Sequence, residues 1–258
     1  MLQSANFDAL AQAYDREFTH TRIGTMQRKR VKHFLQPFIT PKQLNILEIN
    51  CGTGEDALWL AAKGHQVWAS DISLEMIAVA QQKTAQAKFQ VAAFNELREK
   101  YKGQQFDIIF SDFAGLNCIN AQELKQLNED FYQLLAPKGK LILVVLGKKC
   151  FWERMYFTLK GDRQKVNRRQ GEALAQLGHQ ATQPTFCYSV KELQHIFSSF
   201  EFKKSRPVGL FIPPSYMEPW LKRFRLIVPL INLLEFLLAH FSFFSDHADH
   251  TFVVFEKK

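Results

Sequence analysis

Short apolar runs alternate with amphipathic stretches between Leu44 and Leu146. Apolar runs bounded by turn residues are typical of buried strands, whereas apolar positions three and four residues apart are typical of helices. The pattern predicts strands over 44–49, 65–71, 88–93, 106–112 and 137–147, and helices over 55–64, 73–87 and 120–135. Strands that are apolar throughout and separated by helices indicate a parallel sheet with helices on both faces, so we expect an α/β fold.

The residues on either side of this region follow other patterns. Upstream, helical stretches over 4–18 and 23–36 predict an N-terminal helical cap, 1–40, which precedes a core over 41–147. Downstream, we expect a basic helical insertion over 148–200 and a C-terminal part over 201–258. The elements expected in that last part are a strand near 202–210, an apolar helical stretch over 217–244 and a closing strand over 250–257.

Composition narrows the classes of protein that the pattern allows. With 258 residues, 47% of them hydrophobic, the chain has the size of one large domain and is too apolar to be disordered. The net charge of +8 is compatible with a nucleic acid, a phosphate or an anionic membrane as partner, without requiring one. Most of the excess positive charge lies in one segment, because residues 147–206 hold twelve Lys or Arg and five Asp or Glu.

The cysteines and the N-terminus bear on the cellular compartment. Cys51, Cys118, Cys150 and Cys187 form no Cys-x-x-Cys pair, so neither a zinc ribbon nor a disulfide framework is indicated, and no metal site is expected. The first residues are polar and helical in pattern, unlike a signal peptide. We therefore expect a reducing, cytoplasmic setting.

A glycine-bearing turn, Glu48-Ile49-Asn50-Cys51-Gly52-Thr53-Gly54, joins the first predicted strand to the following helix. Glycines let the backbone turn tightly and let a ligand approach the unpaired N–H groups of a helix N-terminus. Asp71 ends the next strand, at a position suited to accept both hydroxyls of a ribose. These features together indicate a nucleoside-containing cofactor at the carboxyl ends of the strands.

Two kinds of cofactor fit this turn. Residues 52–57 match the dinucleotide pattern G-x-G-x-x-G/A, which is typical of NAD(P)-dependent oxidoreductases. The first glycine, however, comes three residues after the strand ends at Ile49, which is longer than a pyrophosphate turn needs. Glu48 would also repel a pyrophosphate, whereas it would favour an ammonium or sulfonium group. The oxidoreductase therefore stays an alternative rather than the preferred interpretation.

The order of the motifs resembles a known family. The segments EINCGTG, Asp71-Ile72-Ser73 with Met76, FDIIFSDFAGLNC and LLAPKGKLILVV are similar to those of class I S-adenosylmethionine-dependent methyltransferases, over about residues 40–147. The resemblance implies a Rossmann-like sheet of seven mostly parallel strands, in which an antiparallel last strand lies between the fifth and the sixth. It also implies S-adenosyl-L-methionine as cofactor and methyl transfer as the activity, and it leaves the acceptor open.

The same resemblance assigns contacts to each part of the cofactor. The residues it implies are Glu48, Asn50, Cys51, Gly52 and Gly54 for the methionine part, Asp71 for the ribose, Ile72, Met76, Ala93 and Phe94 for the adenine, and Ser111 and Asp112 beside the methyl group and its acceptor. Asn50 stands where the family usually has Gly, and Asn tolerates left-handed backbone geometry. Ala93 stands where the family often has an acidic residue that contacts the adenine amino group. In this chain the backbone near Phe94, or Asn95, would make that contact instead.

In the implied topology the segments after the fifth strand and at about 211–249 both begin at the cofactor edge of the sheet. We therefore expect both to fold over the site as helical lids. The second is rich in phenylalanine, and this predicts a small, hydrophobic acceptor. A transmembrane helix over 226–244 is rejected, because Pro229, Glu235 and other residues interrupt the apolar stretch. A membrane span would also place the closing strand on the other side of the bilayer from its sheet. Contact with a membrane surface through Lys222, Arg223 and Arg225 is an alternative role for the segment.

His250 begins the closing strand, and because that strand is antiparallel its start lies at the cofactor edge. We expect His250 to be the base that removes a proton from a hydroxyl acceptor, with Asp112 and Tyr216 as further catalytic candidates. An RNA methyltransferase that uses the basic insertion is the alternative within the family. No recognised RNA-binding module accompanies that insertion, and its aromatic residues fit a helix core as well as base stacking.

Overall fold

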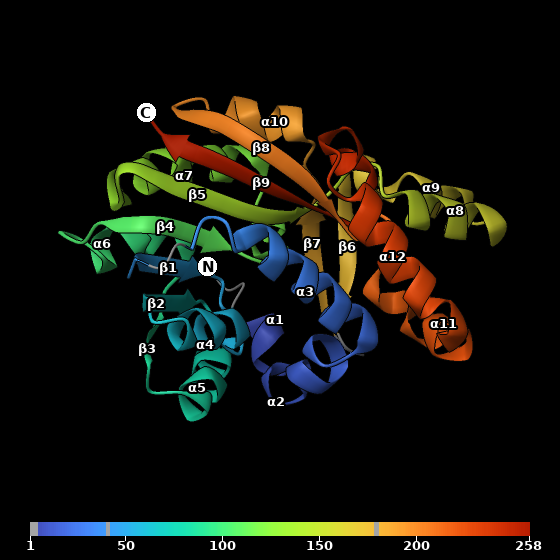
Figure 1. Cartoon of the computed structure of the whole chain (residues 1–258), viewed down its shortest axis with the longest axis horizontal. Helices are drawn as coiled ribbons and strands as arrows, with labels where there is room; N and C mark the ends of the chain where they lie inside the picture. Colours follow the sequence, from blue (N-terminus) through green and yellow to red (C-terminus); the bar gives the residue numbers. More distant parts are fainter. Residues whose placement is uncertain (1–4, 40–41, 178–180) are drawn as a thin grey trace.

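The computed structural model describes residues 5–39, 42–177 and 181–258, and it is built around one seven-stranded sheet (Figure 1). Its strands, in the order in which they pair, are β3 (Ala87–Val91), β2 (Gln66–Asp71), β1 (Asn45–Ile49), β4 (Phe106–Ser111), β5 (Leu135–Leu146), β9 (His250–Lys257) and β8 (Phe200–Val208). β9 runs antiparallel to both of its neighbours, and the pairs from β3 to β5 are parallel. The predicted fold class, including the place of the closing strand, is confirmed.

Helices cover both faces of the sheet. The helices of one face are α3 (Arg22–Leu35), α4 (Glu55–Ala62) and α5 (Leu74–Lys83), and those of the other are α6 (Leu97–Lys100), α7 (Ala121–Leu134) and α10 (Val190–Ile196). Successive side chains of a strand point to opposite faces, so Leu141 and Leu143 of β5 pack in one core while Ile142 and Val144 pack in the other. This two-sided burial explains why the strands are apolar throughout.

Local capping signals place the helix starts where the sequence predicts them. Ser73 Oγ accepts a hydrogen bond from the N–H of Met76 at 3.1 Å, and Asn120 caps α7 in the same way. α5 ends at Lys83 rather than 87, because Ala87 already pairs with Val67 as the first residue of β3. The first helical stretch is also broken, into α1 (Ala5–Asp8), α2 (Ala11–Tyr14) and a π-helical turn, Asp15–Thr19.

The segment between β5 and β8 differs from the predicted helical insertion. It contains α8 (Phe151–Leu159), α9 (Arg163–Val166) and α10, but β6 (Glu172–Leu177) and β7 (Ala181–Phe186) pair as antiparallel strands. The predicted helical insertion over 148–200 is therefore helical only in part. Both strands mix small and polar residues and lack the apolar run of a buried strand, so no local signal marks them. Residues 1–4, 40–41 and 178–180 of the predicted elements lie outside the described residues.

The apolar stretch predicted as one helix over 217–244 is divided. α11 (Glu218–Arg223) and α12 (Val228–Leu238) are separated by a 3₁₀ turn, and a second 3₁₀ segment, Ser242–His247, precedes β9. Pro219 and Pro229 each lie in the first turn of a helix, where the missing N–H costs no hydrogen bond, so each proline begins a new helix. Within the described residues, no helix is both long enough and apolar enough to cross a membrane.

Candidate functional site

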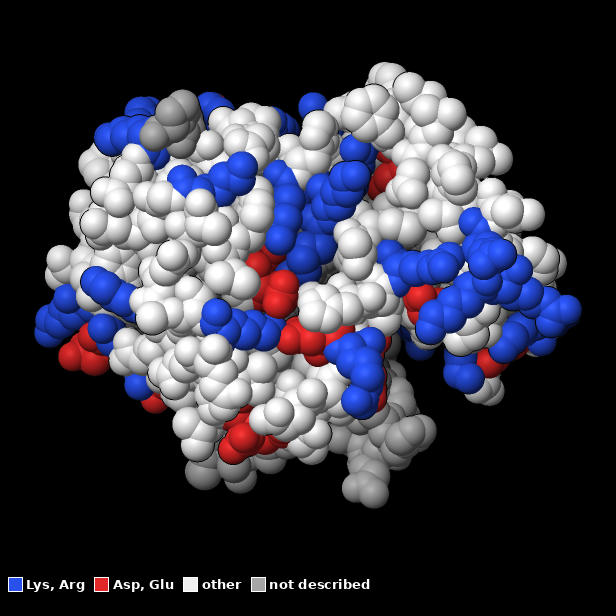
Figure 2. All heavy atoms as spheres, turned by 60° about the horizontal axis from the view of Figure 1, so that its bottom comes forward, with Lys and Arg blue, Asp and Glu red and all other residues white. Residues whose placement is uncertain are grey.

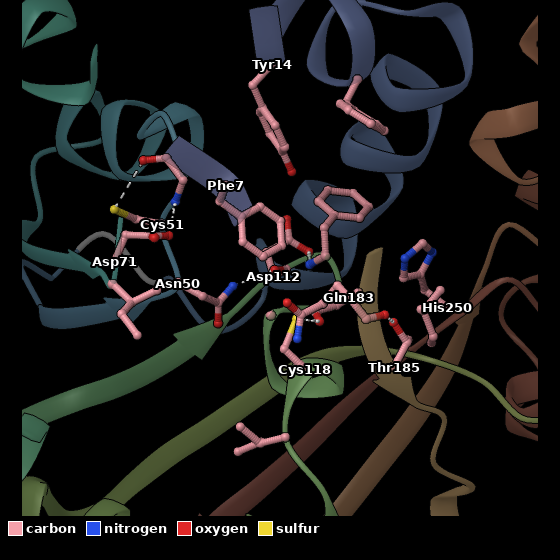
Figure 3. Close-up of a pocket in the computed structure, with 18 of the residues that line it drawn as sticks. Phe7, Tyr14, Asn50, Cys51, Asp71, Asp112, Cys118, Gln183, Thr185 and His250 are labelled. Atoms are coloured by element: carbon pink, nitrogen blue, oxygen red, sulfur yellow. Dashed lines mark hydrogen bonds between the residues drawn. The ribbon is translucent and has the colours of Figure 1, made fainter. Parts of the chain in front are cut away.

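A cavity of about 1530 Å³ lies at the carboxyl ends of β1 to β4. The predicted site residues that line it are Glu48, Asn50, Cys51, Gly52, Asp71, Ile72, Met76, Ala93, Phe94, Asp112, Tyr216 and His250. Gly54 and Ser111 are not among its lining residues, and both lie directly behind them. Figure 3 shows Asn50 and Asp71 on one side of the cavity, Gln183, Thr185 and His250 on the other, and Asp112 between them.

The turn after β1 is held by the carboxylate that ends β2. Asp71 accepts hydrogen bonds from the backbone N–H groups of Gly52 at 2.8 Å and Ser73 at 2.9 Å. Burial raises the pKa of Asp71, and these N–H groups oppose that shift. Asn50 and Gly52 both have left-handed backbone geometry, with φ of 54° and 52°, as expected for a turn that the family builds with glycine. The carboxylate thus fixes the turn and still lines the cavity.

Gly54 supports the turn from behind. It begins α4 with φ of 78°, and a Cβ at this position would lie 2.9 Å from the Cβ of Ala80 and 3.0 Å from the ring of Phe89. This glycine is needed because α4 and its N-terminus approach α5 and β3 closely. Gly54 therefore has a packing role, and the contact with the methionine part that the sequence resemblance implies stays a prediction.

We expect Gly54→Ala to lower the free energy of unfolding by about 2–4 kcal/mol, because it combines left-handed strain with overpacking. Gly64→Ala is the matched control, since Gly64 has φ of 89° but a Cβ there would meet no atom within 4 Å. The control should lose about 1–2 kcal/mol from the strain alone. Chemical denaturation of both variants measures the difference, and equal losses would contradict the packing role.

Asn50 links the ends of β1 and β4. Its Nδ2 donates to the carbonyl oxygen of Asp112 at 2.7 Å, and its Oδ1 accepts from the hydroxyl of Ser111 at 2.6 Å. Ser111 is fully buried and acts on the cavity only through Asn50. The following residues Phe113 and Ala114 also have left-handed geometry, with φ of 45° and 67°. Such strain in consecutive non-glycine residues is typical of functional sites.

Three carboxyl groups and two cations meet beneath this turn. Arg28 of α3 forms an ion pair with Asp56 and lies 3.8 Å from Asp112, and Lys32 lies 3.7 Å from Asp56. Burial, reinforced by Asp56, raises the pKa of Asp112 well above its ordinary value. Burial also raises the pKa of Glu48 well above its usual range, and Asp56 and Asp112 add to this shift. Glu48 Oε2 finds no hydrogen-bond partner among the described residues.

We expect the stability of the ligand-free protein to fall as pH rises through the raised pKa of Glu48. A carboxyl whose folded-state pKa is raised contributes stability at low pH that is lost when it ionises in the fold. Glu48→Gln removes this titration, so from pH 5 to pH 8 its melting temperature should rise relative to that of the native protein. The exposed Glu99→Gln is the control, and a relative fall for Glu48→Gln would mean that the fold favours the ionised form.

The N-terminal helices form one wall of the cavity, which the sequence did not predict. Asp15 accepts a hydrogen bond from the hydroxyl of Thr53 at 2.6 Å and pairs with Lys83 at 2.5 Å, while Asp8 is hydrogen-bonded to Ser73. Tyr14 lines the cavity close to Gly52, and burial raises its pKa to about 12, so its phenol is a hydrogen-bond donor at neutral pH. These contacts pin the cap onto the turns after β1 and β2.

The opposite wall is centred on His250 and the residue before it. Asp249 Oδ2 lies 3.2 Å from His250 Nδ1, and Asp249 also pairs with Arg169 at 2.6 Å. Although burial alone would raise it, His250 and Arg169 hold the pKa of Asp249 well below its ordinary value. Asp249 is therefore ionised, and it lies beside the imidazole without a hydrogen bond to Nδ1. His250 lines the cavity edge-on to the ring of Phe113, 5.4 Å between ring centres.

Tyr216 also lies on this wall, but its environment makes it a poor base. Its hydroxyl donates to Glu153 at 3.3 Å, and burial together with Glu153 raises its pKa strongly. The phenol therefore stays protonated at neutral pH. Glu153 also accepts two hydrogen bonds from Arg168 and one from Arg169.

The predicted phenylalanine-rich lid does not cover the site. From 211–249, the residues that line the cavity are Pro214, Ser215, Tyr216 and Asp249, and none of the six phenylalanines in that segment is among them. Phe224, Phe236, Phe241 and Phe243 are exposed on the outer surface instead. The cavity is closed by the N-terminal helices and by β6 and β7, which contribute Leu174, Gln183 and Thr185. These phenylalanines therefore do not indicate a hydrophobic acceptor, and the expectation drawn from them is wrong.

The cavity has the features that a nucleoside bearing a positive charge requires. The left-handed turn leaves backbone at its wall, Asp71 offers a carboxylate at the end of β2, and the unpartnered Oε2 of Glu48 suits an ammonium group. A cation beside Glu48 would also lower its raised pKa. Within the described part of the chain, no three His, Cys, Asp or Glu side chains are grouped as metal ligands would be.

Residues 46–139, from β1 into β5, match the family described as the methyltransferase domain. The malonyl-[acyl-carrier protein] O-methyltransferase of Hamiltonella defensa is 26% identical over 147 residues, which cover 57% of this chain and 55% of that protein. The tRNA 5-carboxymethoxyuridine methyltransferase of Escherichia coli K12 is 32% identical over 90 residues, 34% of each chain. The chain thus matches about half of the first relative's length and a third of the second's.

Similarity in structure extends over almost the whole chain. The magnesium protoporphyrin IX methyltransferase of Synechocystis PCC 6803, solved with bound SAH, aligns with 99% of this chain and 98% of its own, with a TM-score of 0.64. The sequences are 14% identical, so this likeness concerns the fold. All three proteins are named as methyltransferases, which counts against the dinucleotide alternative.

Proposed function

Since residues 46–139 of this chain are a class I S-adenosylmethionine-dependent methyltransferase domain, we propose that the protein transfers a methyl group from S-adenosylmethionine to a small, neutral acceptor. The observation that carries the proposal is the meeting of the Gly52 turn, Asp71 and the unpartnered Glu48 in one cavity. When bound, the cofactor supplies an activated methyl group. The protein's own task is to orient an acceptor and to exclude water.

Each part of the cofactor has candidate partners in the cavity. Glu48 and the backbone at Asn50 to Gly52 would hold the methionine end, and Asp71 would accept the ribose hydroxyls. Ile72 and Met76, which follow Asp71, would make apolar contacts with the adenine. Its edge would be contacted by Ala93, Phe94 and Asn95. Asp71 would have to share its oxygens between the hydroxyls and the N–H groups of Gly52 and Ser73, and a carboxylate has lone pairs enough for both.

The charges on the opposite wall favour a neutral acceptor. Three arginines are among the described residues that line the cavity, and each is already neutralised by a carboxylate. Arg28 pairs with Asp56, Arg168 pairs with Glu153, and Arg169 pairs with both Glu153 and Asp249. No lysine is among those lining residues, so they offer no spare cation for an anionic acceptor. Apolar side chains such as Phe113, Phe157 and Leu174 would contact its body.

We assign the role of base to His250 and a positioning role to Asp249. Asp249 lies 3.2 Å from Nδ1, so we assign the contact with the acceptor to Nε2. His250 Nε2 would take the proton of an acceptor hydroxyl as the oxygen is methylated, and the ionised Asp249 would stabilise the imidazolium. The bound cofactor would supply the methyl group and keep the sulfur as a neutral thioether. Burial raises the pKa of Asp112, and in its protonated form it would donate a hydrogen bond to the acceptor.

RNA is the second candidate acceptor, favoured by a basic surface on α8 and α9. Arg154, Lys160, Arg163 and Lys165 are exposed there, beside Phe157 and Arg168 of the cavity wall. One of the relatives is named for methylation of a tRNA nucleoside. The neutral inner wall does not distinguish the two, because a nucleobase is also neutral.

Transfer of a labelled methyl group into an extract of the native host tests the acceptor class. The extract is separated into RNA, protein and organic-soluble fractions after incubation with the enzyme and methyl-labelled S-adenosylmethionine. We expect label in the organic-soluble fraction, and an initial rate of labelling at least about a hundredfold lower with His250→Ala. Label confined to RNA would support the second candidate, and label in no fraction would count against methyl transfer.

A further inference from the structure

The outer surface of α12 and of the turns on either side of it carries many large apolar side chains. α12 turns Ile231, Glu235 and Ala239 toward the protein, and these residues recur every four positions on one face. The residues exposed on the other side of α12 and its flanking turns are Phe224, Leu226, Leu230, Leu233, Phe236, Leu237, Phe241 and Phe243. Leu226 is 89% exposed and Phe243 is 80% exposed. A soluble protein rarely leaves so many large apolar side chains together without a partner.

Buried hydrogen bonds fix the rotation of α12 about its axis, and they thereby determine which face of the helix is exposed. Glu235 accepts hydrogen bonds from the N–H groups of Gly209 at 2.9 Å and Phe211 at 2.7 Å. Arg30 of α3 donates to the carbonyl oxygens of Glu235 and Phe236, at the C-terminal end of the helix. These bonds hold the apolar face toward solvent.

The charges on this surface are of one sign. Lys222, Arg223 and Arg225 are exposed at the start of the apolar row. The acidic residues between 218 and 245 are Glu218 and Glu235, and both are buried. Glu218 accepts from the N–H groups of Arg22 and Ile23 at 3.2 and 3.0 Å, as Glu235 does from Gly209 and Phe211. The exposed face therefore combines leucine and phenylalanine with cations and lacks any anion.

We propose that the face formed by α11, α12 and the turns around them docks on an anionic lipid bilayer. An amphipathic helix with apolar side chains on one face and cations beside them is suited to the boundary between headgroups and acyl chains. Figure 2 shows this part of the molecule as an uncharged lobe at the upper right, bordered below by a basic cluster. Because α12 is too short to span a membrane, the docking is peripheral.

Co-sedimentation with sucrose-loaded vesicles tests the proposal on the full chain without any substrate. We expect binding to phosphatidylcholine vesicles that contain phosphatidylglycerol, and at least about tenfold weaker binding to phosphatidylcholine alone. Replacing Leu226, Leu230, Leu233 and Leu237 by Gln leaves the charge unchanged and should lower binding by more than about tenfold. These leucines are exposed, so the variant should fold, which its melting temperature verifies.

Two matched controls separate this face from other surfaces. Leu74→Gln with Leu159→Gln changes exposed leucines elsewhere and should bind as the native protein does. Lys222→Gln, Arg223→Gln and Arg225→Gln together should weaken binding, whereas Lys160→Gln, Arg163→Gln and Lys165→Gln on α8 and α9 should weaken it less. No binding of the native protein, or equal binding by the four-leucine variant, would overturn the proposal. A dimer in solution that the same variant dissociates would show that a second copy covers the face, and would overturn it as well.

Discussion

The Asp71→Ala variant should bind S-adenosylhomocysteine about tenfold to a hundredfold more weakly than the native protein. Two effects act together in this expectation. The ribose would lose a charged hydrogen-bond acceptor, an interaction of about 1.5–3 kcal/mol. The N–H groups of Gly52 and Ser73 would also lose the carboxylate that fixes the turn. Isothermal titration calorimetry measures the change in affinity directly.

Asp107→Ala provides the matched control for this variant. Asp107 also accepts a backbone N–H, that of Asn45 at 2.8 Å, but it lies at the amino ends of the strands, away from the cavity. The Asp107→Ala variant should bind S-adenosylhomocysteine with native affinity, although its free energy of unfolding should fall about as much as that of Asp71→Ala. An Asp71→Ala variant with unchanged affinity would show that the cofactor site is misplaced.

The His250→Ala variant should lower kcat by about a hundredfold to ten-thousandfold, the usual contribution of a positioned general base. Its affinity for S-adenosylhomocysteine should stay close to the native value, because no role in cofactor binding is assigned to His250. Steady-state kinetics with the identified acceptor, together with calorimetry, measures both quantities. The loss should shrink at high pH, where the acceptor hydroxyl ionises more readily without a base.

His247→Ala is the control, since His247 lies three residues earlier and is not among the residues that line the cavity. Asp249→Asn tests the positioning role, because it should shift the pH dependence of kcat rather than abolish activity. Native kcat in His250→Ala would contradict the base assignment and would indicate an acceptor that needs no proton removed.

The sequence carries strong local signals for the core of this fold. Each strand from β1 to β5 is an apolar run, and each of α4, α5 and α7 begins at a turn or capping residue such as Ser73 or Asn120. The sequence also groups the glycine turn and Asp71 in one site, and Asn50, Cys51, Gly52 and Asp71 line the same cavity. These features depend on residues within a few positions of each other, so a pattern along the chain can reveal them.

The rest of the site depends on contacts between distant segments, which a single sequence does not show. Arg28 lies in a basic run that looks like any solvated helix face, and only the fold places it on Asp56. Asp15 and Thr53 are hydrogen-bonded although they are far apart in sequence. Similarly, the periodicity of 217–244 indicates which residues share a face, and it does not say whether that face covers the cavity or faces outward. For this reason the sequence does not reveal that the phenylalanines of this segment lie away from the cavity.

Isothermal titration of the native protein with S-adenosylhomocysteine and, in parallel, with NAD(H) tests the central claim most directly. We expect one binding site per chain for S-adenosylhomocysteine and no heat of binding for NAD(H). Binding of NAD(H) without binding of S-adenosylhomocysteine would contradict this expectation.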